Sequence, residues 1–293
     1  NELLIEVESL NVDSASFHQI KTECGSKIDQ MQEHILNLVA KRGKHHNPVT
    51  GSGGMLIGRV ADIGPLFFAS RKPDICSSDR IATLVSLTLT PLMIKNIRTI
   101  HADLDRVDVD GHAIVFSTGI YAKLPTDIAE AQALAILDVC GAPAQTADLC
   151  KEGQTVVIIG GAGKSGVLCA YSASKAVGKN GRVLLLDYSA EAVKKLKDLS
   201  FVKEAHSIDA RDSVGVYELV KKATKGQMAD VVINVTNIPN TEMSCILSAR
   251  PGGLVYFFSM ATSFTKATLG AEGVGADVTL MMGNGYRPGH AEM

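Results

Sequence analysis

The feature that most constrains this chain is a glycine-rich turn between two apolar runs, within residues 153–189. The first run, Thr155 to Ile159, is rich in β-branched residues, and the second, Val183 to Leu186, ends at the acidic Asp187. The turn between the runs contains the glycines Gly161, Gly163 and Gly166. The residues after the turn are apolar at helical spacing. The stretch therefore predicts a strand, a tight turn, a helix and a second strand.

The glycine spacing is typical of a turn that binds the pyrophosphate of a dinucleotide. The first glycine allows the bend out of the strand, the second lets the pyrophosphate approach the backbone, and the third lets the helix pack on the strand. The pyrophosphate would lie at the positive end of the helix, with Ala162, Lys164 and Ser165 as further contacts; a solvated Lys164 is an equal alternative. The carboxylate of Asp187, 21 residues after Gly166, would bind the adenosine ribose and repel a 2′-phosphate. We therefore expect NAD rather than NADP.

A P-loop is the alternative interpretation of the same turn, because Gly163, Lys164 and Ser165 spell the end of its motif. That motif requires a glycine five places before Gly163, where this chain has Ile158. The spacing therefore excludes a P-loop.

Four further strands are predicted after Asp187 by apolar runs that alternate with helical segments. They begin at Glu204, Ala229, Gly253 and Asp277. With the two strands at the turn, they make the six strands of a doubly wound parallel sheet, the Rossmann fold. Thr236 and Ser259 follow the fourth and fifth strands, at the ends where ligands bind in such sheets, so we expect both to contact the cofactor.

The N-terminal part of the chain has a different pattern. Leu3 to Leu10 and Met55 to Ile63 indicate strands, residues 11–14 a turn or loop, and apolar residues at helical spacing from Lys27 to Lys41 a helix. The sequence thus predicts an α/β protein with a β-rich domain over residues 1–125 and a dinucleotide-binding domain over residues 126–293.

Composition limits the class of protein further. A net charge of −2 without a basic run argues against a nucleic-acid partner. An apolar run of about 18 residues and a signal-peptide pattern are both missing, so we expect a cytoplasmic protein with no membrane partner. The six scattered cysteines suit reduced thiols. The chain opens on Asn1 rather than Met and stops at Met293 as a new segment begins, so we interpret it as a fragment of a longer protein.

A strand-rich domain followed by this nucleotide-binding domain resembles the medium-chain dehydrogenase/reductase superfamily. Residues 58–64 match its G-x-V-x-x-x-G strand, and residues 10–14 are similar to its first zinc-ligand loop. The resemblance implies a GroES-like first domain and a substrate cleft between the domains. In this alignment Asn11 and Gly54, or a neighbour of Gly54, stand at two zinc-ligand positions, and only Cys140 remains at the third. One thiolate cannot hold a catalytic zinc, so we expect no metal.

Four runs of residues resemble the L-erythro-3,5-diaminohexanoate dehydrogenase family more closely. They are residues 11–17, 46–58, 160–166 and 283–292, the last with a break at 287–288. The resemblance implies NAD-dependent oxidative deamination of L-erythro-3,5-diaminohexanoate, a small diamino acid, to 5-amino-3-oxohexanoate and ammonium in lysine fermentation. It also implies a homo-oligomer.

Without zinc, side chains must hold the ammonium group, accept its proton and activate water. By family analogy Asp13 and Ser14 would hold or deprotonate the ammonium group, and His46, with His45 as a weaker candidate, would act as a base near neutral pH. The alternatives are that Asp13 and Ser14 satisfy local backbone N–H groups and that both histidines are plain surface residues. Three further residues are weaker candidates for the pocket: Cys140, which could equally be a small buried thiol, His290 and Glu292.

Two rival functions remain open on the sequence alone. A zinc-free quinone or enoyl reductase of the same superfamily would use NADPH, which the acidic Asp187 disfavours. A non-catalytic protein that kept the fold would bind the nucleotide without turnover of any amine.

Overall fold

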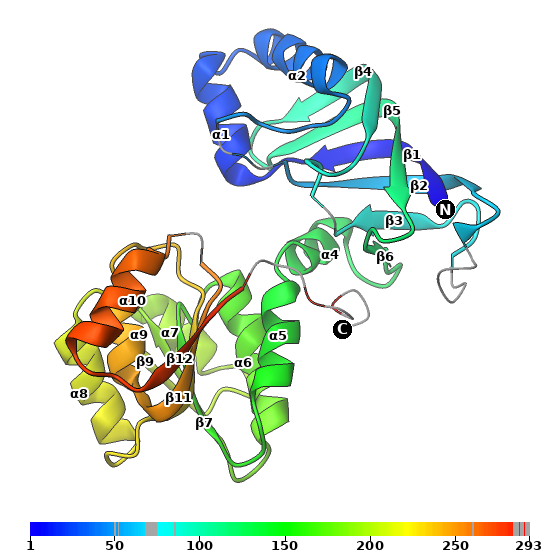
Figure 1. Cartoon of the computed structure of the whole chain (residues 1–293). Coiled ribbons are helices and arrows are strands. Elements are labelled where there is room, and N and C mark those ends of the chain that lie inside the picture. The colour runs from blue at the N-terminus through cyan, green and yellow to red at the C-terminus, as the bar shows by residue number, and fades with distance from the viewer. Residues whose placement is uncertain are drawn as a thin grey trace. The chain divides into compact units, whose positions relative to one another are not determined.

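The computed structural model describes residues 1–49, 51, 53–67, 75–84, 86–259, 261–283, 287 and 290. The chain divides into two compact units, Asn1–Asp138 and Val139–Met293, each with its own sheet (Figure 1). Within the described residues, no helix combines the length and the apolar character needed to cross a membrane.

The first unit is built on a six-stranded antiparallel sheet with the strand order β4-β5-β1-β2-β3-β6. The strands are β1 (Glu2–Asn11), β2 (Met55–Ile63), β3 (Arg80–Thr83), β4 (Leu92–His101), β5 (Arg106–Phe116) and β6 (Tyr121–Lys123). Strand β2 has the predicted bounds, and β1 extends one residue beyond the prediction at each end. Alternate residues of β5 are buried, as expected for a strand with one face on the core.

Two helices, α1 (Ser14–Glu23) and α2 (Ile28–Arg42), contribute to the main core of the first unit (Figure 1). The prediction of a turn or loop over residues 11–14 is wrong at its end, because α1 begins at Ser14. Its N-cap is Asp13, whose Oδ1 accepts a hydrogen bond from the Ser16 N–H at 2.9 Å. Helix α2 confirms the predicted helix over 27–41 and is capped by Gly43, which has a φ of 67°.

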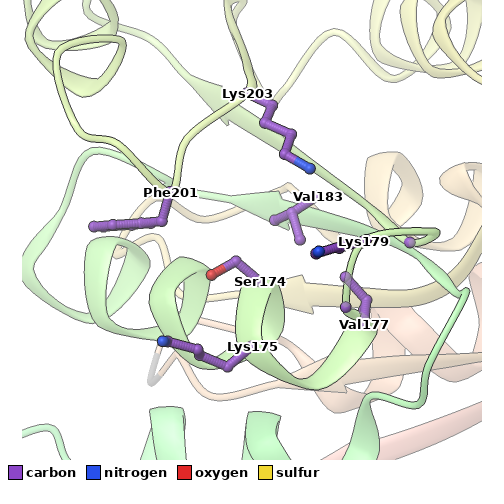
Figure 2. Close-up of a pocket in the computed structure, with 9 residues that line it drawn as sticks. Ser174, Lys175, Val177, Lys179, Val183, Phe201 and Lys203 are labelled. Carbon is purple, nitrogen blue, oxygen red and sulfur yellow. The ribbon is translucent and has the colours of Figure 1, made fainter.

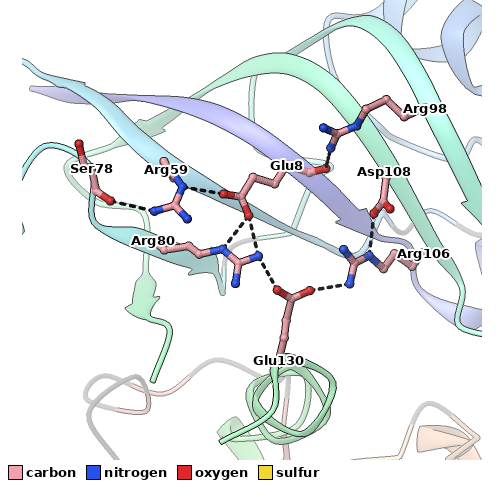
Figure 3. A network of polar contacts seen from close by, with 8 residues as sticks. All are labelled: Glu8, Arg59, Ser78, Arg80, Arg98, Arg106, Asp108 and Glu130. Atoms are coloured by element: carbon pink, nitrogen blue, oxygen red, sulfur yellow. Dashed lines mark hydrogen bonds and ion pairs between the residues drawn. The ribbon is translucent and has the colours of Figure 1, made fainter. Parts of the chain in front are cut away.

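A third helix, α4 (Glu130–Leu137), also belongs to the first unit. The predicted division after residue 125 assigned this segment to the second domain, whereas its side chains contact the first sheet. Figure 3 shows the Glu130 carboxylate between two arginines, Arg80 of β3 and Arg106 of β5. Leu134 packs in a small buried cluster with Ile57 of β2. Charge pairing and apolar packing therefore both join α4 to the antiparallel sheet.

The second unit is a six-stranded parallel sheet with the order β12-β11-β10-β7-β8-β9, and it confirms the predicted doubly wound fold. Its strands are β7 (Thr155–Ile159), β8 (Arg182–Asp187), β9 (Glu204–Ser207), β10 (Ala229–Asn234), β11 (Ala249–Phe257) and β12 (Val278–Met282). Its helices are α5 (Gly141–Leu149), α6 (Lys164–Val177), α7 (Ala190–Leu196), α8 (Ser213–Ala223), α9 (Glu242–Ser248) and α10 (Phe264–Gly273).

Helices cover both faces of this sheet, and successive residues of one strand enter different cores. Val156 of β7 lies in the core under α5, α6 and α7, whereas Val157 lies in the core under α8, α9 and α10. A strand buried on both faces has few polar positions along its length, which explains the continuous apolar runs in the sequence.

Candidate functional site

The glycine-rich turn follows β7 and leads into α6. The N–H groups of Gly160 and Gly161 donate to the Leu186 carbonyl at 2.9 and 3.0 Å, so the turn is fixed to the end of β8. Helix α6 has 14 residues, and no side chain caps its N-terminus at Gly163. The first backbone N–H groups of such a helix have no partner within it and attract an anion. The turn therefore fits a pyrophosphate group.

The structure gives different reasons for the glycines at positions 166 and 163 of the motif. A Cβ at Gly166 would lie 2.1 Å from the Gly160 carbonyl oxygen, so any side chain there would push α6 off the turn. A Cβ at the exposed Gly163 would meet nothing nearer than that same oxygen at 3.4 Å. Protein packing thus demands glycine at 166 but not at 163, and the open surface at Gly163 is room for a ligand to approach the backbone.

Asp187 lies beside this turn at the end of β8. Its Oδ2 accepts a hydrogen bond from the Ala162 N–H at 2.9 Å, and its Oδ1 accepts one from the Ser189 N–H at 3.2 Å. Each oxygen retains a second lone pair that can accept a ribose hydroxyl. The carboxylate is therefore held where the sequence motif predicts an adenosine ribose, and the residues present fit a dinucleotide.

Two further residues follow the carboxyl ends of β10 and β11, at the same end of the sheet as the glycine-rich turn. Thr236 lies directly against the turn, because a Cβ at Gly160 would be 2.9 Å from the Thr236 nitrogen. Ser259 is buried, and its Oγ accepts from the Ala261 N–H at 3.0 Å, which uses the hydroxyl in its own turn. The structure thus brings Thr236 to the nucleotide turn, while Ser259 has a local hydrogen-bond partner.

Sequence reasoning missed Asn234, the last residue of β10. Its buried side chain accepts from the Thr236 N–H at 3.2 Å and donates to the Thr241 hydroxyl at 2.9 Å, so it orders the loop after the strand. The available signal was a single amide residue at the end of an otherwise apolar run.

A cavity of about 400 Å³ lies at the amino ends of the parallel strands, at the end of the sheet opposite to the glycine-rich turn. It is lined by the end of α6 and by residues at the amino ends of β8 and β9, and Lys179 and Lys203 both point toward Val183 in its wall (Figure 2). Because the glycine-rich turn follows the carboxyl end of β7, this cavity is not the pyrophosphate site.

In the first unit, Asp13 and Ser14 lie at the N-terminus of α1. The alternative that Asp13 satisfies a local backbone N–H group holds for Oδ1, which caps the helix. Its Oδ2 is buried and has no hydrogen-bond partner in the described part of the chain. Ser14 is exposed, and its Oγ donates to Asp105 Oδ2 at 2.7 Å.

The two histidines of the loop after α2 differ in their exposure. The expectation that both are plain surface residues is wrong for His45, which is 0% exposed and whose two ring nitrogens find no partner among the described residues. His46 is half-buried, and its Nδ1 is likewise buried and unpaired within those residues. Burial lowers the pKa of His45, although the nearby Gly53 backbone and the charge of Asp13 act in the opposite direction.

The structure gives a physical reason why a zinc ligand is missing at one predicted position. Gly54 has a φ of 94°, and a Cβ there would lie 2.1 Å from the Asn11 carbonyl oxygen. A histidine at this position is sterically excluded. Within the described ranges, no three His, Cys, Asp or Glu side chains form a group that could hold a metal ion.

The weaker candidates lie in the second unit. Cys140 is buried beside the start of α5, and His290 is 2% exposed and accepts from the Arg287 N–H at 3.0 Å. Glu292 lies outside the described residues.

Among solved structures, the chain resembles medium-chain dehydrogenase/reductase-like proteins. A quinone oxidoreductase of Pseudomonas syringae pv. Tomato DC3000 is 17% identical with a TM-score of 0.61, over 97% of this chain and 73% of that one. Identity at this level shows the fold alone.

The sequence relatives are more specific. Residues 1–125 match the family described as the L-erythro-3,5-diaminohexanoate dehydrogenase N-terminal domain. A curated protein of Acetoanaerobium sticklandii with that enzyme name is 54% identical over 293 residues, 100% of this chain and 85% of the relative. One of the same name from Fusobacterium nucleatum is 51% identical over 291 residues, 99% of this chain and 84% of the relative. This chain therefore belongs to the L-erythro-3,5-diaminohexanoate dehydrogenase family.

Proposed function

We propose that the chain catalyses the NAD-dependent oxidative deamination of L-erythro-3,5-diaminohexanoate at C3, giving 5-amino-3-oxohexanoate and ammonium. The observation that carries the proposal is identity above one half with two dehydrogenases of that name, over essentially the whole chain. The fold supports it without deciding it, because one fold serves many reactions.

A dehydrogenase of this fold uses a nicotinamide cofactor, and we propose NAD as that cofactor. The turn after β7 and Asp187 would hold NAD, which would supply an acceptor for the hydride from C3 of the substrate. The chain holds the Asp187 carboxylate against the turn by the Ala162 N–H. A fixed negative charge beside the ribose site favours free hydroxyls and repels a 2′-phosphate.

We assign the proton transfers of this reaction to the first unit. Asp13 Oδ1 keeps a lone pair that the Ser16 N–H does not use, so it can bind the C3 ammonium group and accept a proton from it. His46, which is half-buried, activates the water that hydrolyses the imine. Ser14 fixes the start of α1 through Asp105, so its role is to position Asp13.

Homo-oligomerisation and a cytoplasmic location are part of the same proposal. Strand β12 is an edge strand, and large apolar side chains are exposed on it and on the neighbouring α10: Met282 at 39%, Phe264 at 60% and Leu269 at 65%. An exposed apolar edge of this kind favours contact with a second copy. All six cysteines are free thiols, as expected in a reducing compartment.

The test of the proposed activity is the formation of NADH by the purified protein with L-erythro-3,5-diaminohexanoate, followed by its absorbance, with NADP in a parallel reaction. The expected result is reduction that depends on the diamine and is faster with NAD. Binding of NAD without turnover of the diamine would contradict the proposal. Oxidation of NADPH by a quinone or an enoyl substrate would favour the reductase instead.

A further inference from the structure

His45 is a buried titratable side chain to which the reaction above gives no role. Its exposed fraction is 0%, and neither Nδ1 nor Nε2 has a partner among the residues that the structure describes. Buried polar groups are nearly always hydrogen-bonded, because losing water without a replacement is costly. An imidazole in this position therefore implies a specific interaction.

Asp13 supplies a complementary atom. Oδ1 of its carboxylate caps α1, whereas Oδ2 is buried and has no partner in the described ranges. Burial has the largest effect on the pKa of His45 and lowers it, whereas the Gly53 backbone and, after it, the Asp13 charge raise it. The other titratable side chain that acts on the ring, His34 of α2, lowers the pKa. The net direction leaves His45 neutral at neutral pH, so it carries one N–H donor.

The backbones of the two residues pack against the same pair of adjacent glycines. Asn47, 1% exposed, donates from Nδ2 to Gln19 Oε1 at 2.9 Å and thereby fixes the loop of His45 on α1. A Cβ at Gly53 would be 2.5 Å from the His45 carbonyl oxygen, and a Cβ at the adjacent Gly54 would be 2.8 Å from the Asp13 nitrogen. Two consecutive glycines thus pack against the backbones of both residues, and no side chain at either position separates them.

We propose that His45 is a positioning residue for Asp13: its neutral ring donates an N–H to a water that bridges to Oδ2, and this contact keeps the carboxylate oriented. This inference rests on the proposed function for its catalytic meaning. The hydrogen bond itself does not, because it joins two groups of the protein without substrate.

The hydrogen bond is tested first by NMR of the full chain without ligands. We expect a slowly exchanging imidazole N–H proton signal that is assigned to His45 by its loss in H45Q and that disappears or moves in D13N. Absence of the signal in the wild type, or an unchanged signal in D13N, would overturn the proposal. This readout stays valid even if the diamine is not a substrate.

The consequence for catalysis is tested with the variants H45F and H45Q. In H45F, which keeps a ring but no N–H, kcat/KM for the diamine is expected to fall at least tenfold. H45Q keeps an amide donor and should recover most of this loss, while the affinity for NAD stays unchanged in both variants. If H45F does not fold, H45A removes the same donor. Equal losses of kcat/KM in H45F and H45Q would reduce His45 to a packing residue.

Discussion

Asp187 Oδ2 accepts a hydrogen bond from the backbone N–H of Ala162 at 2.9 Å. This bond joins the acidic end of β8 to the middle of the glycine-rich turn. The Asp187 carboxylate therefore holds the turn by its oxygen, and in the proposed function its charge would also select the cofactor.

The two functions of Asp187 can be separated by substitution. Asp187→Asn keeps an oxygen that can accept from Ala162 but removes the charge, whereas Asp187→Ala removes both. We expect the Asp187→Asn substitution to shift the ratio of kcat/KM for NAD to that for NADP by about tenfold or more in favour of NADP. A charge-assisted contact of about 1.4 kcal/mol corresponds to a factor of ten in this ratio. Initial rates with both cofactors measure the ratio. An unchanged ratio in both variants would remove Asp187 from cofactor selection.

The close approach of α6 to the turn predicts a large effect of Gly166→Ala. Because the added Cβ would lie 2.1 Å from the Gly160 carbonyl oxygen, we expect a loss of about 2 kcal/mol or more in the free energy of unfolding and a weaker affinity for NAD. Gly273→Ala is the matched control, since it is also helical and a Cβ there meets nothing within 4 Å. It should be neutral or stabilising by up to about 1 kcal/mol. Denaturant unfolding and NAD titration of both variants compare them.

Glu130 is expected to contribute to the stability of the first unit. Its carboxylate binds Arg80 and Arg106 with about a quarter of the side chain exposed, so Glu130→Gln should cost about 1–2 kcal/mol after allowance for solvent screening. The exposed pair of Glu191 and Lys195 is the control, and Glu191→Gln should cost less than about 0.5 kcal/mol. Chemical unfolding at low and high salt measures both. If both substitutions lowered the free energy of unfolding equally, the contact of α4 with the two arginines would contribute no more than an exposed ion pair.

Asp108 should make the stability of the first unit depend on pH. Burial opposes its ionisation, but hydrogen bonds from His101 and Arg106 hold its pKa below the ordinary value of 3.8. A folded pKa below the unfolded one means that the contribution is complete above about pH 4 and is lost as pH falls through the folded pKa. The Tm of the wild type should therefore fall further between pH 5 and pH 3 than the Tm of Asp108→Asn. Thermal unfolding followed by circular dichroism measures both. Parallel losses in the two proteins would contradict this assignment.

The parts of the structure that the sequence predicted well depend on local patterns. Strands β7, β8 and β10 are apolar runs, and the turn has its glycines at fixed offsets, so these were found to within one residue. Strand β11 begins at Ala249, earlier than the predicted start at Gly253. Helix α1 was missed because it begins at a single capping residue, Asp13, directly after a strand. The burial of His45 was missed because it depends on contacts between distant segments, such as Asn47 with Gln19 and Gly54 with Asn11. No pattern within a glycine-rich and proline-containing loop reveals such contacts.

The attachment of α4 also decides where this chain should be cut to make chimaeras with other members of its family. A junction after residue 125 takes the helix from the donor of the nucleotide-binding unit, so Arg80 and Arg106 would meet a foreign side chain in place of Glu130. A junction after Asp138 transfers the helix together with both arginines and with Ile57, against which it packs. Recombination at the later point therefore exchanges each sheet together with the side chains that pack on it, and hybrids joined there should keep the first unit intact.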